Sequence, residues 1–130
     1  MLTNSSLLKE HGYVNGQWVG DDAKSRFDVT NAYSNEVISS LPDMGKKETD
    51  EAIDAANNAW PEWRARTAKE RAGILKKWFD LIMANQEDLA ILMTAEQGKP
   101  IAEARGEVGY GASFIEWFAE EGKRTYGDVI

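Results

Sequence analysis

The first third of the chain alternates apolar and polar residues, which is the pattern of β-strands. Residues 13–19 read YVNGQWV, and Asn-Gly between apolar flanks is the strongest short signal for a hairpin turn, because both turn positions need positive φ. A second pair of strands is predicted around Phe27–Val29 and Val37–Leu41, with turn residues between them. Pro42 cannot donate to a strand ladder and closes the region. The pattern therefore predicts two β-hairpins within residues 13–42.

After Gly45 the apolar residues recur at the three- and four-residue spacing of helices, which predicts about four helices within residues 46–126. Pro61 is expected to end or kink the first of these helices. Thr67 and Glu70 have the spacing of a capping box, in which each side chain accepts a hydrogen bond from the other residue's backbone amide. This pattern predicts the start of the second helix.

The third and fourth predicted helices meet at a glycine and a proline. Asn85 is expected to cap the third helix, which stops at Gly98, and Pro100 opens the fourth, which runs to about Tyr126. The residues expected on the buried face of the fourth helix are Ile101, Ala104, Val108, Ala112, Ile115 and Phe118. Two-stranded ribbons are marginal by themselves and need further surface to cover them. The chain is therefore predicted to be the opening part of a larger protein.

Composition limits the classes of function. The 130 residues carry 15 basic and 22 acidic side chains, a net charge of −7, which would repel a phosphate backbone and argues against nucleic acid as a partner. The chain contains no cysteine, which excludes disulfides and a cysteine nucleophile within these residues. The longest apolar run, Leu89–Met93, is too short to span a bilayer, and the first residues lack the pattern of a targeting signal. We therefore expect a cytoplasmic location and no membrane partner.

A cluster of three glycines in six residues, Gly106, Gly109 and Gly111, could be a phosphate-binding loop or part of a helix. A dinucleotide loop needs Gly-x-Gly-x-x-Gly between a strand and the N-terminus of a helix. Here the order is Gly-x-x-Gly-x-Gly within a continuous helical pattern, so both spacing and context argue against a cofactor loop. Two alternatives remain, which are a helix with a small face for close packing and a helix beside a ligand channel, with Tyr110 projecting into it.

Six segments succeed one another in a specific order: YVNGQWV, DVTNAYSNEVI, TDEAIDAANNAWPEWR, TAKERAGILKKWFDLI, LMTAEQGKP and GASFIEWFAEEGKRTYGD. In this order the chain resembles the N-terminal part of aldehyde dehydrogenases, from Tyr13 to Ile130. The last two segments are most similar to bacterial, NADP-using succinate-semialdehyde dehydrogenases. The resemblance implies an α/β parent with a Rossmann-type cofactor-binding domain, of which residues 1–130 form the N-terminal part. The catalytic and oligomerisation parts are then expected beyond Ile130, in a homotetramer or homodimer.

The resemblance implies oxidation of succinic semialdehyde to succinate in 4-aminobutyrate breakdown, with reduction of NADP or NAD. A cysteine thiolate is expected to form a thiohemiacetal with the small aldehyde substrate, followed by hydride transfer and hydrolysis of a thioester. These residues are expected beyond Ile130, in the rest of the same polypeptide, so no catalytic or cofactor-binding residue is assigned within the chain. The alternative is a truncated, non-catalytic helical interaction module derived from this family.

One site implied by the resemblance is a substrate tunnel. Gly106 and Tyr110 correspond to its tunnel-facing positions, and residues four apart share one face of a helix. The phenol of Tyr110 could also hydrogen-bond a polar substrate. Packing of Tyr110 in a core is the alternative interpretation.

A second implied site is a monovalent-cation position. Glu96, with the backbone carbonyls of Val29 and Thr30, matches the ligands found in some members of the family. Two residues differ from the family pattern, since Glu96 replaces a frequent aspartate and Ala32 stands where proline is common. A solvated Glu96 without a ligand role is the alternative.

Overall fold

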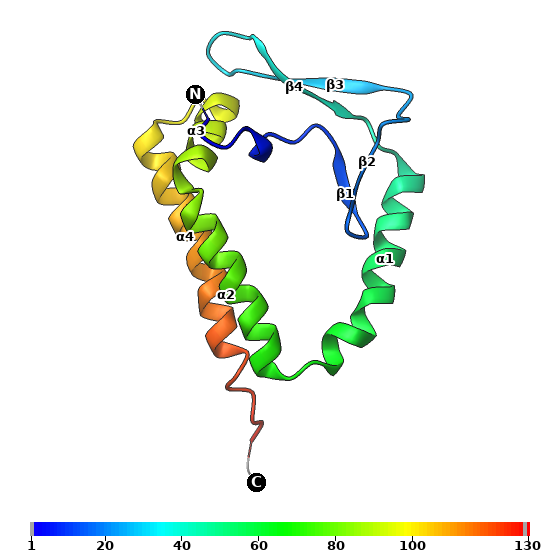
Figure 1. Ribbon diagram of the computed structural model, residues 1–130, viewed down its shortest axis with the longest axis vertical. Coiled ribbons are helices and arrows are strands. Elements are labelled where there is room, and N and C mark those ends of the chain that lie inside the picture. The colour runs from blue at the N-terminus through cyan, green and yellow to red at the C-terminus, as the bar shows by residue number, and fades with distance from the viewer. Residues whose placement is uncertain (1, 129) are drawn as a thin grey trace.

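The computed structural model describes residues 2–128 and 130, and its elements follow the predicted order (Figure 1). Two antiparallel hairpins come first and four helices follow, which confirms the mixed α/β class. The elements, including a short 3-10 turn η1, are η1 Ser5–Leu7, β1 Gly12–Val14, β2 Gln17–Val19, β3 Arg26–Thr30, β4 Val37–Pro42, α1 Lys46–Ala65, α2 Ala68–Ala84, α3 Gln86–Gln97 and α4 Ile101–Glu121.

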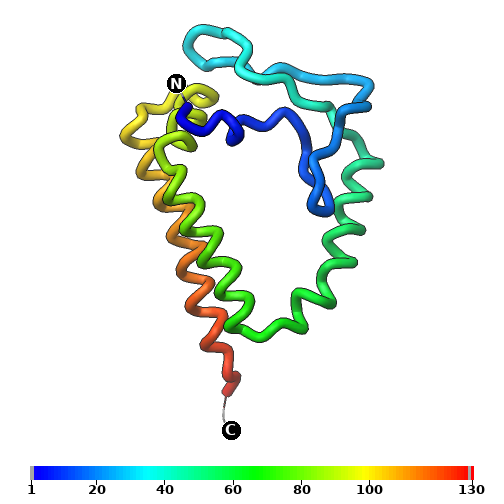
Figure 2. The backbone as a smooth tube through the Cα atoms, in the orientation of Figure 1, coloured from blue at the N-terminus to red at the C-terminus, as the bar shows by residue number. Residues whose placement is uncertain are grey.

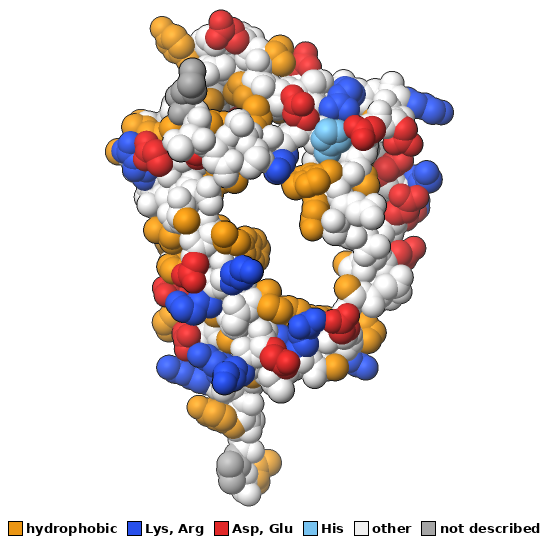
Figure 3. Space-filling model, viewed as in Figure 1, with side chains coloured by type: hydrophobic (Ala, Val, Ile, Leu, Met, Phe, Trp, Pro, Cys, Tyr) orange, Lys and Arg blue, Asp and Glu red, His pale blue; other side chains and the backbone are white. Residues whose placement is uncertain are grey.

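The elements form an open frame (Figures 1 and 2). Helices α2 and α4 lie side by side along one side of the frame, and α1 forms the other side. The strands and the N-terminal segment close one end, and the connection between α1 and α2 closes the other. The space-filling view shows an opening through the middle (Figure 3), and α1 has no buried residue. The main hydrophobic core therefore lies on the side formed by α2, α3 and α4.

The hairpin of β1 and β2 has the turn that its sequence predicts. Asn15 has φ of 50° and Gly16 has φ of 80°, so both turn residues occupy the left-handed region that a type I′ turn requires. The register places Tyr13 opposite Trp18, and the centroids of the two rings lie 4.9 Å apart. A two-residue turn thus brings two large aromatic side chains together across the strands.

The hairpin of β3 and β4 is connected to the helical side through its loop. A bulge interrupts the ladder between Val29 and Thr30, and Pro42 ends β4 as predicted. Beyond β3, the amide of Ala32 donates a hydrogen bond to the carbonyl of Ala95 at 3.0 Å. This contact holds the end of β3 beside the C-terminal end of α3.

Helix α1 does not end at Pro61 but continues to Ala65. A proline lacks the amide that would bond the carbonyl four residues earlier, here that of Asn57. Only the last turn of α1 follows Pro61, so the loss affects a single hydrogen bond close to the natural end of the helix. Of the two effects predicted for Pro61, an end or a kink, the structure therefore excludes an end of the helix there.

Helix α2 begins with the predicted capping box. The amide of Thr67 donates to Glu70 Oε2 at 2.8 Å, and the amide of Glu70 donates to Thr67 Oγ1 at 3.3 Å. Hydrogen bonding from the Thr67 hydroxyl, and then from its amide, lowers the pKa of Glu70 below its usual value. Because the folded-state pKa is lowered, this stabilisation is present above the unfolded-state pKa and is lost as pH falls through the folded-state pKa.

Small residues form the centre of the helical core. Ala90 of α3 and Ala104 of α4 are fully buried and pack with Val108. Four larger side chains surround them: Ile82, Leu89, Met93 and Ile101. Alanine at these positions allows the helix backbones to approach closely, so added volume there would be expected to strain the packing.

The structure corrects the predicted face and end of α4. Phe118 is 61% exposed, whereas Ala119 is buried, because the helical stripe through Ala112 continues at position 119, where a small residue suits close packing. The helix ends at Glu121 and Gly122 follows as its C-cap, five residues before the predicted end at Tyr126. Glycine after the last periodic residue is itself a stop signal, so this end was readable from the sequence.

Helix α3 has the predicted boundaries, but Asn85 does not make the predicted capping bond. Gly98 has φ of 74° and ends the helix in the left-handed conformation, as predicted. Asn85 precedes the helix, but its side chain makes no capping bond to it. The side-chain nitrogen Nδ2 of Asn85 instead donates to the backbone carbonyl of Leu81 in α2 at 2.8 Å. Pro100 was predicted to be the first residue of α4, but it is the N-cap, and the helix begins one position later at Ile101.

Candidate functional site

The candidate site is the outer face of α4, which carries Gly106 and Tyr110. Tyr110 is 67% exposed, so its ring does not pack into the core of the described residues. A Cβ added to Gly106 would meet nothing within 4 Å. The absence of a side chain at Gly106 therefore leaves open space one helical turn from the phenol ring.

Aromatic side chains extend this face along the second half of α4. Phe114 lies edge-on to Tyr110, with ring centroids 4.8 Å apart and an interplanar angle of 78°. Trp117 follows at the next helical position on the same side and is also exposed. Phe114 and Trp117 were not part of the predicted site, although their spacing of four and seven residues from Tyr110 is a readable signal.

A shallow hollow lies over this aromatic face. Its lining combines aromatic rings with charged groups: Tyr110, Ser113, Phe114, Glu116, Trp117, Phe118, Glu120, Glu121 and Arg124. Two of these carboxylates are in ion pairs: Glu120 lies 2.6 Å from Nζ of Lys123, which is outside the lining, and Glu121 lies 3.2 Å from Arg124. The hydrogen bond from Lys123 lowers the pKa of Glu120 below its usual value. The arrangement can hold a molecule with an apolar body and a polar end.

The glycine cluster does not form a phosphate site. Gly106, Gly109 and Gly111 all lie inside α4, beyond its first turn. Backbone amides inside a helix are bonded to carbonyls four residues earlier, so they cannot point at a pyrophosphate as the free amides of a helix N-terminus do. The predicted helical context of the cluster is confirmed, and these residues do not fit the phosphates of NADP.

The elements of the predicted cation position meet in the fold. The bond between Ala32 and Ala95 places the end of β3 at the C-terminus of α3, where Glu96 is exposed. A Cβ added to Gly98 would lie 3.3 Å from that of Ala32, which shows how closely the two segments approach. The free carbonyls at a helix C-terminus carry partial negative charge and favour a cation.

Neither a cluster of metal ligands nor a membrane-spanning helix occurs among the described residues, 2–128 and 130. No group of three or more His, Asp or Glu side chains in them could hold a metal ion. None of their helices is both long enough and apolar enough to cross a membrane.

Comparison with known proteins defines the class of this chain. The model of the aldehyde dehydrogenase family matches residues 18–130. Because this match includes most of the sequence, the chain belongs to the aldehyde dehydrogenase family. The hairpins and helices described above are therefore a segment of the aldehyde dehydrogenase fold.

Individual relatives make the similarity more specific. The chain is 57% identical over 129 residues to a succinate-semialdehyde dehydrogenase (NADP(+)) of Escherichia coli and 55% identical to a glutarate-semialdehyde dehydrogenase of Pseudomonas putida, with 99% of the chain covered in each case. The crystal structure of a succinate-semialdehyde dehydrogenase from Burkholderia pseudomallei matches with a TM-score of 0.95, 52% identity and 99% coverage. The chain spans only 27% of the length of each of these three proteins.

Proposed function

We propose that this chain is the N-terminal part of an enzyme that oxidises succinic semialdehyde to succinate, with NADP or NAD as the oxidant. The observation that carries the proposal is the high identity, over nearly the whole chain, to semialdehyde dehydrogenases. The cysteine that forms the thiohemiacetal and thioester, and the cofactor site, are assigned to the rest of the polypeptide. The chain itself has no cysteine, and its glycine cluster lies inside a helix.

The contribution of α4 to this function is to line the path of the substrate. Gly106 leaves the path open, and the ring of Tyr110 forms its wall. Phe114 supports the ring edge-on at 4.8 Å between centroids. The phenol oxygen can donate or accept a hydrogen bond, which suits a substrate that has a carbonyl at one end and a carboxylate at the other.

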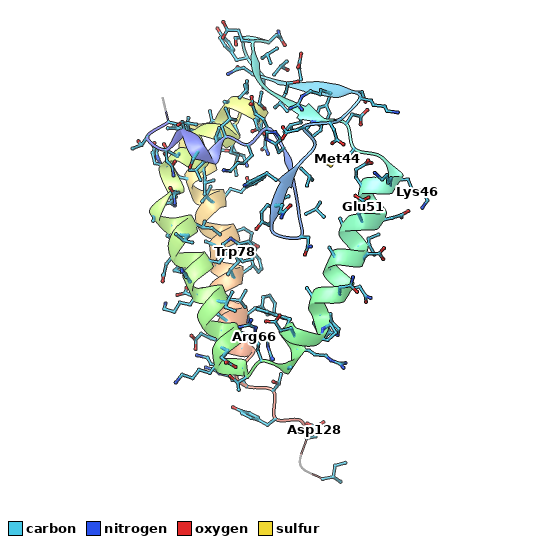
Figure 4. All side chains as sticks on the ribbon, turned by 45° about the vertical axis from the view of Figure 1, so that its right-hand side comes forward. Met44, Lys46, Glu51, Arg66, Trp78 and Asp128 are labelled. Carbon is cyan, nitrogen blue, oxygen red and sulfur yellow. The ribbon has the colours of Figure 1, made fainter. Side chains whose placement is uncertain are left out.

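The partner that covers the open faces of the frame is the rest of the same polypeptide. Trp78 of α2 is exposed and lies across the frame from Met44 and Glu51 (Figure 4). Trp60 of α1 and Trp117 of α4 are exposed as well. Large apolar side chains gathered in this way need a partner surface, and the chain spans about a quarter of its relatives' length (27%). A soluble cytoplasmic homodimer or homotetramer is the proposed assembly.

The proposed function is tested by kinetics on the purified, complete polypeptide. Formation of NADPH or NADH is followed with succinic semialdehyde, glutaric semialdehyde and butanal, which lacks the distal carboxylate. We expect the highest kcat/KM for succinic semialdehyde and a preference for NADP. A higher kcat/KM for glutaric semialdehyde would identify that compound as the substrate instead. Absence of turnover with both semialdehydes would contradict the proposal.

Replacing Tyr110 tests the substrate path. We expect Tyr110→Ala in the complete enzyme to lower kcat/KM for succinic semialdehyde by about fivefold, because one aromatic contact contributes roughly 1 kcal/mol. Tyr110→Phe separates the ring from its hydroxyl. The matched control is Tyr33→Ala, which removes a fully exposed tyrosine from the loop between β3 and β4. Equal kinetic constants for Tyr110→Ala and the control would show that Tyr110 does not line the path.

We also propose that Glu96, with the carbonyls of Val29 and Thr30, binds a monovalent cation. The complete protein should then unfold at a higher temperature in potassium or sodium chloride than in tetramethylammonium chloride of equal ionic strength, with a stabilisation of about 1 kcal/mol. Glu96→Gln should remove this difference, and Glu103→Gln, which changes another exposed glutamate, should retain it. The same melting temperature in all three salts would exclude the site.

A further inference from the structure

The first residues of the chain form a strap across the closed end of the frame. This N-terminal strap, residues 2–11, runs from α3 on one side to β1 on the other (Figure 1). Apart from the 3-10 turn Ser5–Leu7, it has no regular secondary structure. Something other than a helix or a sheet must therefore hold the beginning of the strap in place.

The strap is bound at its start by the carboxylate of Asp88. Asp88 Oδ1 accepts a hydrogen bond from the amide of Thr3 at 2.9 Å, and Oδ2 accepts one from the amide of Asn4 at 2.7 Å. The bonds join residues 85 and 84 positions apart in the sequence. Each oxygen thus receives one of two successive backbone amides, which is a two-point recognition of extended main chain.

Asp88 has no other described partner that would satisfy its charge. It is only 5% exposed, and no Lys, Arg or His of the described residues forms an ion pair with it. A buried carboxylate is costly unless it is hydrogen-bonded. The first turn of α3, in which Asp88 lies, favours a negative charge, and the strap supplies the two hydrogen bonds.

The other end of the strap is tied to the hairpins. The guanidinium of Arg26 donates to the carbonyl of Glu10 at 2.9 Å and to that of Ser40 in β4 at 2.6 Å. Nζ of Lys9 lies 4.6 Å from the ring centroid of Trp18, a cation–π distance. The strap therefore connects α3 with both hairpins.

We propose that Asp88 is a latch that fastens the N-terminal strap to α3, and that opening the latch releases the strap without unfolding the helices. The binding partner of Asp88 is the strap of the same chain. Between its two attachment points the strap exposes Ser5 and Ser6, and Leu7 and Leu8 are only partly buried, so no fully buried side chain opposes its release. Segments with few buried contacts open locally at a smaller free-energy cost than the core. Release of the strap loosens the β1–β2 hairpin from α3 and exposes the carboxylate of Asp88.

Hydrogen–deuterium exchange on the complete polypeptide, read by mass spectrometry, tests the latch. In Asp88→Asn, the N-terminal peptide containing Thr3 and Asn4 should exchange about tenfold faster or more, the effect of losing a hydrogen bond to a charged group. Peptides from α2 and α4 should exchange as in the unmodified protein. The matched control is Asp80→Asn, which removes an equally charged but exposed side chain on α2 and should leave the strap unchanged.

A second pair of variants keeps the test independent of the folding of Asp88→Asn. Thr3→Pro removes one of the two donated amides and should also accelerate exchange of the strap. Ser5→Pro is its control, because Ser5 is the first residue of the 3-10 turn and its amide makes no hydrogen bond with the described residues. If Asp88 is the latch, adding Thr3→Pro to Asp88→Asn should not increase the exchange rate of the strap any further.

Two results would overturn the latch. The first is exchange of the strap in Thr3→Pro at the rate of the Ser5→Pro control. The second is a double variant in which the exchange rate of the strap rises by the product of the two single factors. Independent effects multiply in this way when the two groups do not act together.

Discussion

Replacing Gly20 with alanine is expected to lower the free energy of unfolding of the protein by about 3 kcal/mol or more. Gly20 has φ of 110°, a conformation that side chains rarely allow. An added Cβ would lie 2.5 Å from Cγ and 2.8 Å from Cβ of Pro42, and 2.9 Å from Cε of Met44. The methyl group of Met44 can move aside, but the ring of Pro42 is rigid and buried in β4. Backbone strain and overpacking therefore act together at this position.

Gly73 provides the matched control for this substitution. It lies inside α2, and a Cβ added there would meet nothing within 4 Å. Gly73→Ala should therefore stabilise the protein by up to about 1 kcal/mol, the helix-propensity difference. Denaturant unfolding curves of the two variants measure both effects. A midpoint for Gly20→Ala at or above that of the unmodified protein would show that β4 moves to accept the methyl group.

The isolated segment of residues 1–130 is expected to oxidise no aldehyde and to bind no NADP. It contains no cysteine to attack the aldehyde, and its three clustered glycines lie inside α4, where their amides cannot hold a phosphate. The measurements are NADPH absorbance at 340 nm with succinic semialdehyde and titration calorimetry with NADP. The complete polypeptide at equal molar concentration serves as the positive control. Turnover by the isolated segment would contradict the assignment of catalysis to the rest of the polypeptide.

The same sample distinguishes the alternative of a free-standing helical module. The exposed apolar side chains of α1, α2 and α4, including Trp60, Trp78 and Trp117, should make the isolated segment self-associate. Its apparent mass by light scattering should therefore rise with concentration. A stable monomer over a wide concentration range would favour the free-standing module.

Local chemistry made several parts of the fold predictable. Asn15 and Gly16 specified a turn because few residue pairs tolerate positive φ at both positions, and the structure has those angles. Thr67 and Glu70 specified the start of α2 because their bonds join residues three positions apart. Of the candidate site, the sequence supplied Gly106 and Tyr110, and the fold added Phe114 and Trp117 to the same face of α4.

Contacts between distant residues were not predictable in this way. The sequence could not choose between Phe118 and Ala119 for the buried face of α4, because hydrophobicity favours phenylalanine while a close helix contact requires a small residue. Nothing near Asp88 in the sequence indicates that its carboxylate binds the amides of Thr3 and Asn4. An acidic residue in the first turn of a helix is common without such a partner.

Four features could be predicted from the amino-acid sequence, because each depends on residues close together in the chain: the order of the elements, the hairpin turn, the helix cap at Thr67 and the resemblance to a family. Three others became visible only in the folded chain: the buried face of α4, the docking of β3 on α3 through Ala32 and Ala95, and the binding of the N-terminal strap by Asp88. These features depend on backbone groups brought together from distant positions, and every residue type carries the same backbone groups.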